Sequence, residues 1–191
     1  MTKNDFLVRF NLLQLTESAH TYKHLSSLKS AAVLIGIIES SSDGQLSVLL
    51  TKRASHLRHH PSQVSFPGGK VESTDKSIID TALRETFEEI GVPRQAINVI
   101  GQLPPYQTIS GFNVTPVVAV INFNQDYQLD NNEVAEIFHV PLQHFLTSDQ
   151  DHMLIASKAG IDHKVHFLPY QHYNIWGATA VMIKDLVELI R

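Results

Sequence analysis

Cysteine is absent from the 191 residues of the sequence. Disulfide bridges, thiolate metal sites and cysteine nucleophiles are therefore excluded. No stretch approaches the roughly 20 consecutive apolar residues that a membrane-spanning helix requires. The first residues also lack the charged start, apolar run and cleavage site of a secretion signal. We therefore expect a cytoplasmic protein that makes no contact with a membrane.

An excess of basic residues is missing as well. The 15 Lys and Arg residues are outnumbered by 19 Asp and Glu residues, and the formal net charge is −4. General binding to nucleic acid is not expected without a basic surface. An anionic substrate would therefore have to meet local positive charge or a metal ion. The length suits one domain, residues 1–191, with residues 1–29 as a helical extension packed on it.

The pattern of apolar residues predicts strands and helices in alternation. Residues 31–39 and 45–52 are rich in β-branched residues and flank a turn-forming segment, which predicts an antiparallel hairpin. Residues 53–65 are expected to form a loop before a short strand. Further strands are predicted at 96–103, 113–122, 134–140, 152–157 and 164–168, with Pro116 indicating an edge or a bulge. Helices are predicted at 5–28 (one or two), 77–90, 141–146 and 175–190. This order favours an α/β fold with a mixed sheet and helices on its faces.

The helix predicted from Ser77 to Ile90 has a start signal and a stop signal. Ser77 and Asp80 resemble a capping box, and Gly91 suits the left-handed residue that ends a helix. At 100° per residue one arc of this helix is apolar and is expected to pack on the sheet. The arc comprises Ile79, Ala82, Leu83, Phe87 and Ile90.

Three glutamates lie roughly opposite this arc. Glu85, Glu88 and Glu89 are spaced at i, i+3 and i+4, so their side chains converge within one turn and repel one another. A solvated acidic face is one interpretation, and Arg84 can neutralise part of the charge by bridging to Asp80 or Glu88. The other interpretation is a divalent cation, which prefers carboxylate oxygens. A tight turn at Pro67-Gly68-Gly69 favours the cation, because its backbone carbonyls can face the same ion.

This segment resembles the Nudix box, which reads G, five residues, E, seven residues, R-E-U-x-E-E-x-G-U, where U is aliphatic. The matching residues are Gly69, Arg84, Glu85, Glu88, Glu89, Gly91 and Val92. Asp75 replaces the first Glu of the motif, one extra residue precedes Arg84, and Thr86 occupies an aliphatic position. The resemblance implies an α/β/α sandwich that hydrolyses nucleoside diphosphate derivatives with Mg²⁺ or Mn²⁺, with Glu85, Glu88, Glu89 and Gly69 as metal ligands.

The preceding segment, residues 49–69, resembles the signature of the coenzyme A pyrophosphatase branch of that family. Leu49-Leu50-Thr51, Arg53, Arg58 and Phe66-Pro67-Gly68-Gly69 are in register, and residues 175–180 are also similar, whereas Ser62 stands where glycine is typical. The resemblance implies hydrolysis of coenzyme A or its thioesters to 3′,5′-ADP and 4′-phosphopantetheine. Arg53, Arg58 and Lys70 are the candidate substrate-binding residues, since arginine grips phosphate well. The alternative is that these cations only solvate a loop.

Several assignments stay open at this stage. Glu133 or Glu136 could supply a further ligand or a general base, and Glu133 could equally be a solvated residue. His56, His59 and His60 suit a solvated or phosphate-contacting loop better than a zinc site. Trp176 is expected to pack at the start of a helix rather than to stack on adenine. The competing functions are hydrolysis of ADP-ribose or a nucleotide sugar, and nucleotide binding without catalysis. A homodimer is possible.

Overall fold

The computed structural model describes residues 1–12, 27–147, 152–158 and 161–191. Within these residues an eight-stranded mixed sheet contains the path β3-β2-β1-β7-β5, while β4, β6 and β8 pair with β1, β7 and β2 respectively. The strands are β1 (Lys29–Glu39), β2 (Leu46–Arg53), β3 (Val64–Ser65), β4 (Gly68–Lys70), β5 (Ile97–Gln102), β6 (Tyr106–Gln107), β7 (Phe112–Ile121) and β8 (Val134–Pro141). The predicted β1–β2 hairpin and the mixed sheet are confirmed.

The central strand β1 is apolar from Ala31 to Ile38 because both faces of the sheet are covered there. Successive side chains of a strand point to opposite faces, and the odd-numbered residues of β1 pack in one apolar cluster and the even-numbered ones in another. Ile35 and Ile37 lie in the first cluster and Ala32 and Leu34 in the second, all of them fully buried. A strand that is buried on both faces needs this continuous apolar run.

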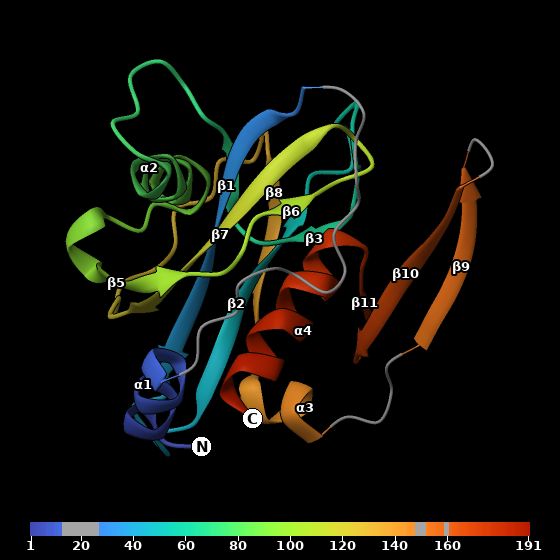
Figure 1. Ribbon diagram of the computed structural model, residues 1–191. Helices are drawn as coiled ribbons and strands as arrows, with labels where there is room; N and C mark the ends of the chain where they lie inside the picture. Colours follow the sequence, from blue (N-terminus) through green and yellow to red (C-terminus); the bar gives the residue numbers. More distant parts are fainter. Residues whose placement is uncertain (13–26, 148–151, 159–160) are drawn as a thin grey trace.

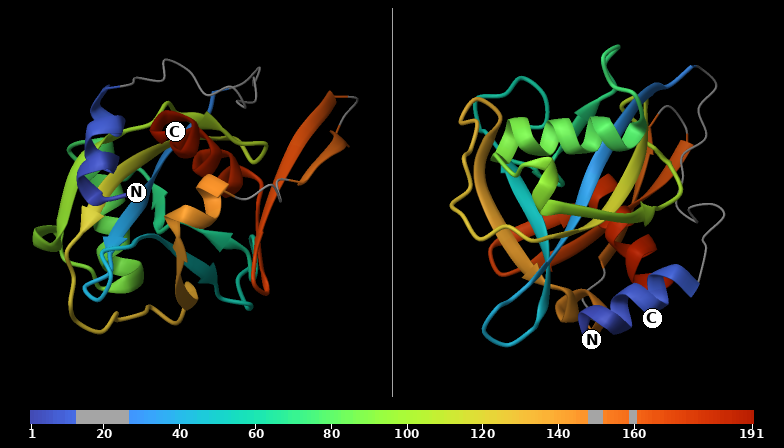
Figure 2. Two further views of the ribbon diagram at one scale, coloured as in Figure 1. Left: turned by 90° about the horizontal axis from the view of Figure 1, so that it is seen from below. Right: turned by 90° about the vertical axis from the view of Figure 1, so that its left-hand side faces the viewer.

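Helices supply the two covering layers (Figure 1). Helix α2 (Ile78–Ile90) packs on the face of the second cluster, whereas α1 (Lys3–Leu12), α3 (Leu142–Thr147) and α4 (Ala178–Ile190) pack on the face of the first. The right-hand view of Figure 2 shows α2 in front of the sheet and α4 behind it. The expected α/β/α sandwich is therefore the architecture observed.

The N-terminal helix α1 is attached to the end of the chain. Phe6 and Phe10 are buried in the same cluster as α4, and Arg9 Nη1 donates a hydrogen bond of 2.9 Å to the carbonyl of Ile190. The remainder of the segment predicted as helical, residues 13–26, lies outside the described residues. The packing of α1 accords with the prediction of one domain over residues 1–191, which stays a prediction.

Strand β7 corrects the interpretation of Pro116. This strand lies inside the sheet, parallel to β1 on one side and antiparallel to β5 and β6 on the other. Pro116 falls between the residues paired with β5, which begin at Val117, and those paired with β6, which end at Val114. The missing N–H of proline is tolerated because the ladder is interrupted there, so neither an edge nor a bulge at Pro116 is needed.

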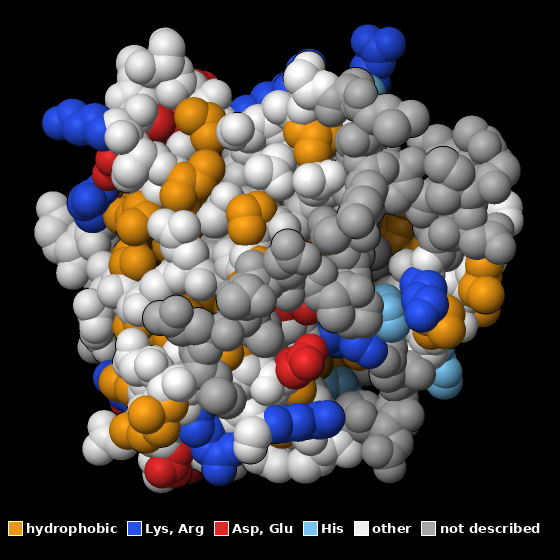
Figure 3. Space-filling model, in the orientation of Figure 1, with side chains coloured by type: hydrophobic (Ala, Val, Ile, Leu, Met, Phe, Trp, Pro, Cys, Tyr) orange, Lys and Arg blue, Asp and Glu red, His pale blue; other side chains and the backbone are white. Residues whose placement is uncertain are grey.

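A second sheet of three strands, in the order β11-β10-β9, stands beside the first (Figure 1). Its strands are β9 (His152–Lys158), β10 (Ile161–Tyr170) and β11 (Tyr173–Trp176). The predicted helix over 175–190 therefore begins too early, because Ile175 and Trp176 belong to β11 and α4 begins only at Ala178. In Figure 3 apolar side chains lie at the edge of the molecule where Figure 1 places β9 and β10. Met153, Leu154 and Ile155 of β9 are exposed.

Helix α2 has the predicted ends but a different buried face. The Ser77 side chain accepts a hydrogen bond from the Asp80 N–H, and Gly91 ends the helix with φ 74°. Ala82, Thr86 and Ile90 are fully buried at i, i+4 and i+8, whereas Phe87 is 56% exposed. Packing Phe87 on the sheet was therefore a wrong expectation. The polar Thr86 can be buried because its hydroxyl donates a hydrogen bond of 2.6 Å to the Ala82 carbonyl.

No helix within the described parts of the chain combines the length and the apolar character that crossing a bilayer requires.

Candidate functional site

The three glutamates of α2 occupy different environments. Glu89 is 3% exposed, so it belongs to the buried side of the helix rather than to a solvated face. The Glu85 side chain is 15% exposed and the Glu88 side chain is 56% exposed. Helix α2 packs against β1 and β4, which places Glu85 beside Gly69. A buried carboxylate requires compensation, and this requirement argues against the solvated-face interpretation for Glu89.

The electrostatics of Glu89 show that protein groups compensate its charge incompletely. Burial is the main cause that raises the pKa of Glu89 to about 8, and the negative charges of Glu133 and Glu85 add to it. The positive charge of Arg53 lowers the pKa but does not reverse the shift. Burial likewise raises the pKa of Glu85, against the opposing effect of Arg84. Carboxylates that ionise reluctantly beside one another are suited to a divalent cation, which supplies the missing positive charge.

The Arg84 guanidinium forms ion pairs with three neighbouring carboxylates. Its guanidinium donates to Asp75 through Nε (2.9 Å) and Nη2 (3.0 Å), and through Nη1 to Glu85 and Glu88 (2.9 Å each). Nη2 also donates a hydrogen bond of 3.0 Å to the Lys70 carbonyl. The predicted bridge to Glu88 is present, but the alternative bridge to Asp80 is not, because Asp80 pairs with Arg94 at 2.6 Å. Arg84 thereby fixes Glu85 against β4.

Asp75 takes the place of the first glutamate of the motif. Its side chain is 4% exposed, and its hydrogen bond to Arg84 is the main cause that holds the pKa of the Asp75 carboxyl well below its usual range. Thr81 donates a further hydrogen bond of 2.8 Å to Asp75. The shorter aspartate reaches Arg84 from the loop of residues 71–77, which also contains the extra residue. Although Asp75 departs from the motif, it still forms an ion pair with Arg84.

Gly69 lies in strand β4 and not in the predicted tight turn. Gly68 and Gly69 pair with Val33 and Ala32 of β1, so the two glycines extend the sheet. A Cβ atom on Gly69 would lie within 2.6 Å of both carboxylate oxygens of Glu85. Glycine is therefore required here by the close approach of a side chain, not by a turn.

Gly69→Ala is expected to displace Glu85 while leaving the sheet in place. Alanine has no conformational strain at this position, so the main effect is on the position of the carboxylate. For the diphosphate hydrolysis that the sequence predicts, we expect kcat/KM to fall about a hundredfold, the cost of a misplaced reacting group, with a circular dichroism spectrum like that of the wild type. Turnover within about twofold of the wild type would show that the position of Glu85 against β4 is unimportant.

Glu88 shares the Arg84 Nη1 donor with Glu85 in this conformation. Its carboxylate bonds to Arg84 and is mostly exposed. Among the described residues, no three His, Asp or Glu side chains are gathered closely enough to hold a metal ion. The ligand set Glu85, Glu88, Glu89 and Gly69 therefore stays a prediction, which requires Glu88 to leave Arg84.

The surroundings of Glu133 and Glu136 differ. Glu136, on β8, accepts a hydrogen bond from the Tyr173 hydroxyl, which raises the pKa of Tyr173 to about 12. Glu133 is exposed, and its charge raises the pKa of both Glu85 and Glu89. Glu133 therefore acts electrostatically on Glu85 and Glu89, whereas Glu136 is hydrogen-bonded to Tyr173. This difference favours Glu133 as the further metal ligand or general base.

The basic residues predicted to bind substrate are not gathered at one point. Arg53 ends β2, and its charge acts on Glu89. Arg58 is exposed in the loop that follows, and the Lys70 ammonium lies 5.8 Å from the centre of the Phe112 ring. Ser62 has φ 59°, so the position where the signature has glycine is indeed left-handed. Arg53 is thus the one of these three cations that the structure places beside the carboxylates.

A cleft of about 470 Å³ opens next to Arg53. It lies between the 53–65 segment, the turn from β6 to β7, and β10, β11 and the start of α4. His60, Lys164 and Trp176 line it together with Arg53, and none of the described residues that line it is acidic. The sequence interpretation did not include Lys164 here and placed Trp176 in a helix. In the structure Tyr173 and Ile175 of β11 are buried whereas Asn174 and Trp176 are exposed, as in a strand with one covered face.

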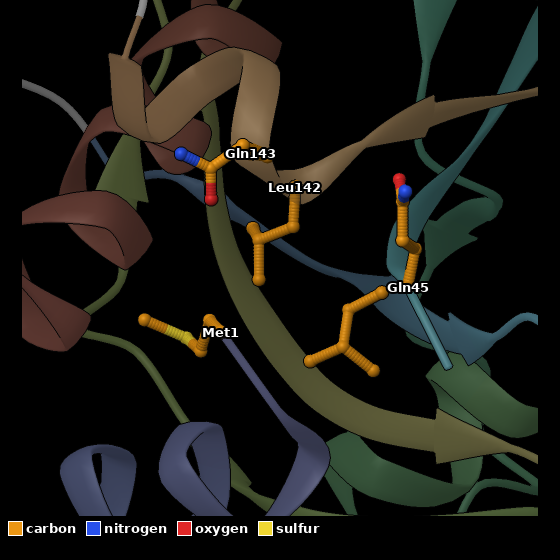
Figure 4. A pocket seen from close by; sticks show the side chains of 5 residues that line it. Met1, Gln45, Leu142 and Gln143 are labelled. Atoms are coloured by element: carbon orange, nitrogen blue, oxygen red, sulfur yellow. The ribbon is translucent and has the colours of Figure 1, made fainter. Parts of the chain in front are cut away.

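Another pocket lies far from the carboxylates, between the N-terminus, β2 and α3. Figure 4 shows Met1, Gln45, Leu142 and Gln143, which line it with Leu46. Its volume is about 260 Å³, and none of these lining side chains carries a charge. A pocket without charged side chains is not suited to a diphosphate. The cleft beside Arg53 is the better candidate of these two, because Arg53 and Lys164 line it.

Comparison with known sequences identifies relatives along nearly the whole chain. Residues 29–159 match the family described as the NUDIX domain. The chain is 44% identical over 186 residues to a protein of Enterobacter sp. (strain 638) named uncharacterized Nudix hydrolase NudL, which covers 97% of this chain and 93% of that protein. A protein of the same name from Klebsiella pneumoniae (strain 342) is 43% identical, with 96% of this chain and 92% of that protein covered.

Comparison with solved structures shows the same fold. The Nudix hydrolase RenU of M. smegmatis has a TM-score of 0.52 at 23% identity and covers 63% of this chain and 74% of its own. A Nudix hydrolase of Alicyclobacillus acidocaldarius has a TM-score of 0.52 at 18% identity and covers 86% of this chain and 93% of its own. At these identities the similarity concerns the fold alone.

Proposed function

Since the chain belongs to the Nudix hydrolases, which cleave nucleoside diphosphate derivatives and generally use divalent metal ions, we propose that its substrate is coenzyme A or a thioester of it. Water adds to one phosphorus of the diphosphate, and the bond between that phosphorus and the bridging oxygen breaks. The products are 3′,5′-ADP and 4′-phosphopantetheine, or its acyl form. The resemblance of residues 49–69 to the coenzyme A pyrophosphatase signature supports this choice of diphosphate.

One observation carries the proposal. Arg53 belongs to that signature, its charge acts on Glu89, and it also lines the cleft, in which none of the described lining residues is acidic. Arg53 thus stands at the junction between the carboxylates and the cleft, where the diphosphate of a bound substrate has to lie. Arg58 and Lys70 are the further proposed phosphate contacts, since both are exposed on segments next to this junction.

The chain's own residues have distinct roles in the proposal. Glu85, Glu88 and Glu89, with the carbonyl of Gly69, are the proposed ligands for Mg²⁺ or Mn²⁺, and Arg84 positions Glu85. A divalent cation, when bound, neutralises the charge on a diphosphate and lowers the pKa of water. Glu133 is the proposed further ligand or general base, because it is exposed and its charge acts on Glu85 and Glu89.

A panel of substrates tests the choice of diphosphate. We expect kcat/KM with coenzyme A to exceed that with ADP-ribose, NADH and oxidised dGTP at least about tenfold, which corresponds to about 1.4 kcal/mol of differential transition-state binding. Dephospho-coenzyme A lacks only the 3′-phosphate and is expected to be cleaved less efficiently than coenzyme A. A preference for ADP-ribose would overturn the assignment to coenzyme A. Binding of coenzyme A without turnover of any diphosphate would show a nucleotide-binding domain without catalysis.

A further inference from the structure

The second sheet carries apolar side chains on one of its faces. In antiparallel strands two residues that lie opposite each other share a face, and so do residues two apart along one strand. Val165 lies opposite Leu154, and Phe167 lies opposite Trp176. These four residues therefore extend over one face from β9 across β10 to β11, and we call them the apolar face. Leu154 is 60% exposed and Trp176 is 38% exposed, so both ends of the apolar face are open to solvent.

The opposite face of the same sheet is mixed in character. Lys164 lies opposite Ile155, and His166 lies opposite Met153, so polar side chains of β10 accompany the apolar ones of β9 there. Lys164 borders the cleft beside Arg53 but does not belong to the apolar face. A contiguous exposed apolar surface marks a binding site more often than scattered apolar residues do. The apolar face is therefore the better candidate of the two for binding an apolar group.

The apolar face continues the cleft beside Arg53. Val165 and Trp176 line this cleft, and Ile109, which is 39% exposed, lines it from the turn between β6 and β7. Arg53 comes from the main sheet, so the cleft has a charged side toward the carboxylates of α2 and an apolar side toward the second sheet. Phe167 stacks on Trp176 with ring centroids 6.2 Å apart and planes 13° apart, which holds the indole on the sheet.

A thioester of coenzyme A has the same distribution of polarity as this surface. Its diphosphate is anionic, and its acyl chain, at the far end of the pantetheine arm, is apolar. Neighbouring strands lie about 4.8 Å apart, so the apolar face extends about 10 Å from Trp176 on β11 to Leu154 on β9. Several methylene groups of an acyl chain can therefore be removed from water there, and each of them contributes to affinity. Free coenzyme A ends in a thiol and leaves the apolar face exposed.

We infer that the apolar face binds the acyl chain of a coenzyme A thioester, so that acylated substrates are preferred over free coenzyme A. The inference rests on the proposed function, because it takes the diphosphate of the same substrate to lie at Arg53. It assigns recognition of the acyl group to the second sheet, whereas the metal and the diphosphate belong to α2 and the main sheet. Val165, Phe167 and Trp176 also lie outside residues 29–159, which match the NUDIX domain.

Two neighbouring residues of β9 provide a matched pair of variants. Leu154 and Ile155 are 60% and 65% exposed but lie on opposite faces of the sheet. For the wild type we expect KM for octanoyl-coenzyme A to be about tenfold lower than KM for free coenzyme A. Leu154→Ser is expected to reduce this ratio about fivefold, because the acyl chain loses an apolar contact. Ile155→Ser is the control and should leave both KM values as in the wild type. No effect of Leu154→Ser, or equal effects of both variants, would overturn the inference.

A binding experiment separates the inference from the proposed function. Trp176 is the only tryptophan of the chain, so its fluorescence reports on the apolar face alone. In metal-free buffer we expect octanoyl-coenzyme A to shift the emission to shorter wavelength in a saturable manner, and 3′,5′-ADP to cause no shift. Hydrolysis of coenzyme A without this shift would overturn the inference and leave the proposed function standing. The shift without turnover of any diphosphate would overturn the proposed function and leave the acyl site standing.

A second copy of the chain is the other candidate to cover the apolar face. Sedimentation velocity of the wild type and of Leu154→Ser distinguishes this partner from an acyl chain. We expect the two proteins to have the same sedimentation coefficient. A dimer that Leu154→Ser dissociates would assign the apolar face to a second copy and overturn the inference.

Discussion

Replacing Glu89 with glutamine is expected to reduce metal-dependent turnover about a thousandfold, equivalent to about 4 kcal/mol of lost stabilisation of the transition state. Glutamine has nearly the same shape, so the buried side chain still fits against the sheet, but it cannot provide an anionic ligand. The steady-state kcat of the purified variant at saturating Mg²⁺ or Mn²⁺ measures the effect. Glu188→Gln, at an exposed glutamate on α4, is the matched control and is expected to retain full activity.

The same substitution has an expected effect on stability. The pKa of Glu89 is raised to about 8 from an ordinary value of 4.5. Between these pH values the native state holds a proton that the unfolded chain has lost, so the free energy of unfolding falls as pH rises. The slope contributed by Glu89 is at most about 1.4 kcal/mol per pH unit. Glu89→Gln removes this contribution, so the variant gains stability relative to the wild type as pH rises toward 8.

Denaturant unfolding in metal-free buffer at pH 6 and pH 8 checks this expectation. A bound cation replaces the proton, so added Mg²⁺ or Mn²⁺ should stabilise the wild type more at pH 8 than at pH 6. If the stability difference between the wild type and Glu89→Gln does not change with pH, Glu89 does not have the raised pKa that its burial indicates.

Arg84→Ala is expected to lower both stability and activity. Asp75 has a side chain that is 4% exposed, and the substitution leaves its charge without the ion pair that holds its pKa low. Removing one partner of a buried pair is strongly destabilising, and we expect a loss of about 3 kcal/mol in the free energy of unfolding. Activity should fall as well, because Glu85 loses the donor that positions it against β4.

Arg94→Ala provides a control with the same chemical change. Arg94 also pairs with an aspartate, Asp80, but its side chain is 64% exposed, so solvent screens the pair. Its removal should therefore cost much less stability than the removal of Arg84. Denaturant titrations of both variants at neutral pH measure the difference. Equal losses would show that the Asp75–Arg84 pair is an ordinary surface ion pair.

Some elements were predictable because local sequence determines them. The ends of α2 follow from the Ser77 side chain and the left-handed Gly91, which act within one turn of the helix. The β1–β2 hairpin follows from two β-branched runs around a turn. The likeness to the Nudix box likewise located Arg84 and the glutamates, because those residues lie close together in sequence.

Other features depended on contacts between distant segments. The buried face of α2 is centred on Thr86, not on Leu83 and Phe87, because the sheet and β4 determine which side of the helix is covered. Glu89 consequently became a buried carboxylate, which helical periodicity alone placed on the polar side. Pro116 was acceptable inside the sheet only because two different strands, β5 and β6, share one flank of β7.

The cleft was the least predictable part of the site. Arg53 and Trp176 are separated by more than a hundred residues, and no local pattern indicates that they line one recess. The helical interpretation of residues 175–190 also placed Ile175 and Trp176 in a helix, whereas both belong to β11. Once Trp176 is in a strand opposite Phe167, its role as a packing residue at a helix start no longer applies.

Incubation of coenzyme A with the wild-type protein, followed by chromatographic identification of the products, tests the central claim most directly. The proposal predicts equimolar 3′,5′-ADP and 4′-phosphopantetheine with Mg²⁺ or Mn²⁺, and neither product with a chelator or with the Glu89→Gln variant. Absence of these products with both metals, or their formation unaffected by the chelator and by Glu89→Gln, would contradict it.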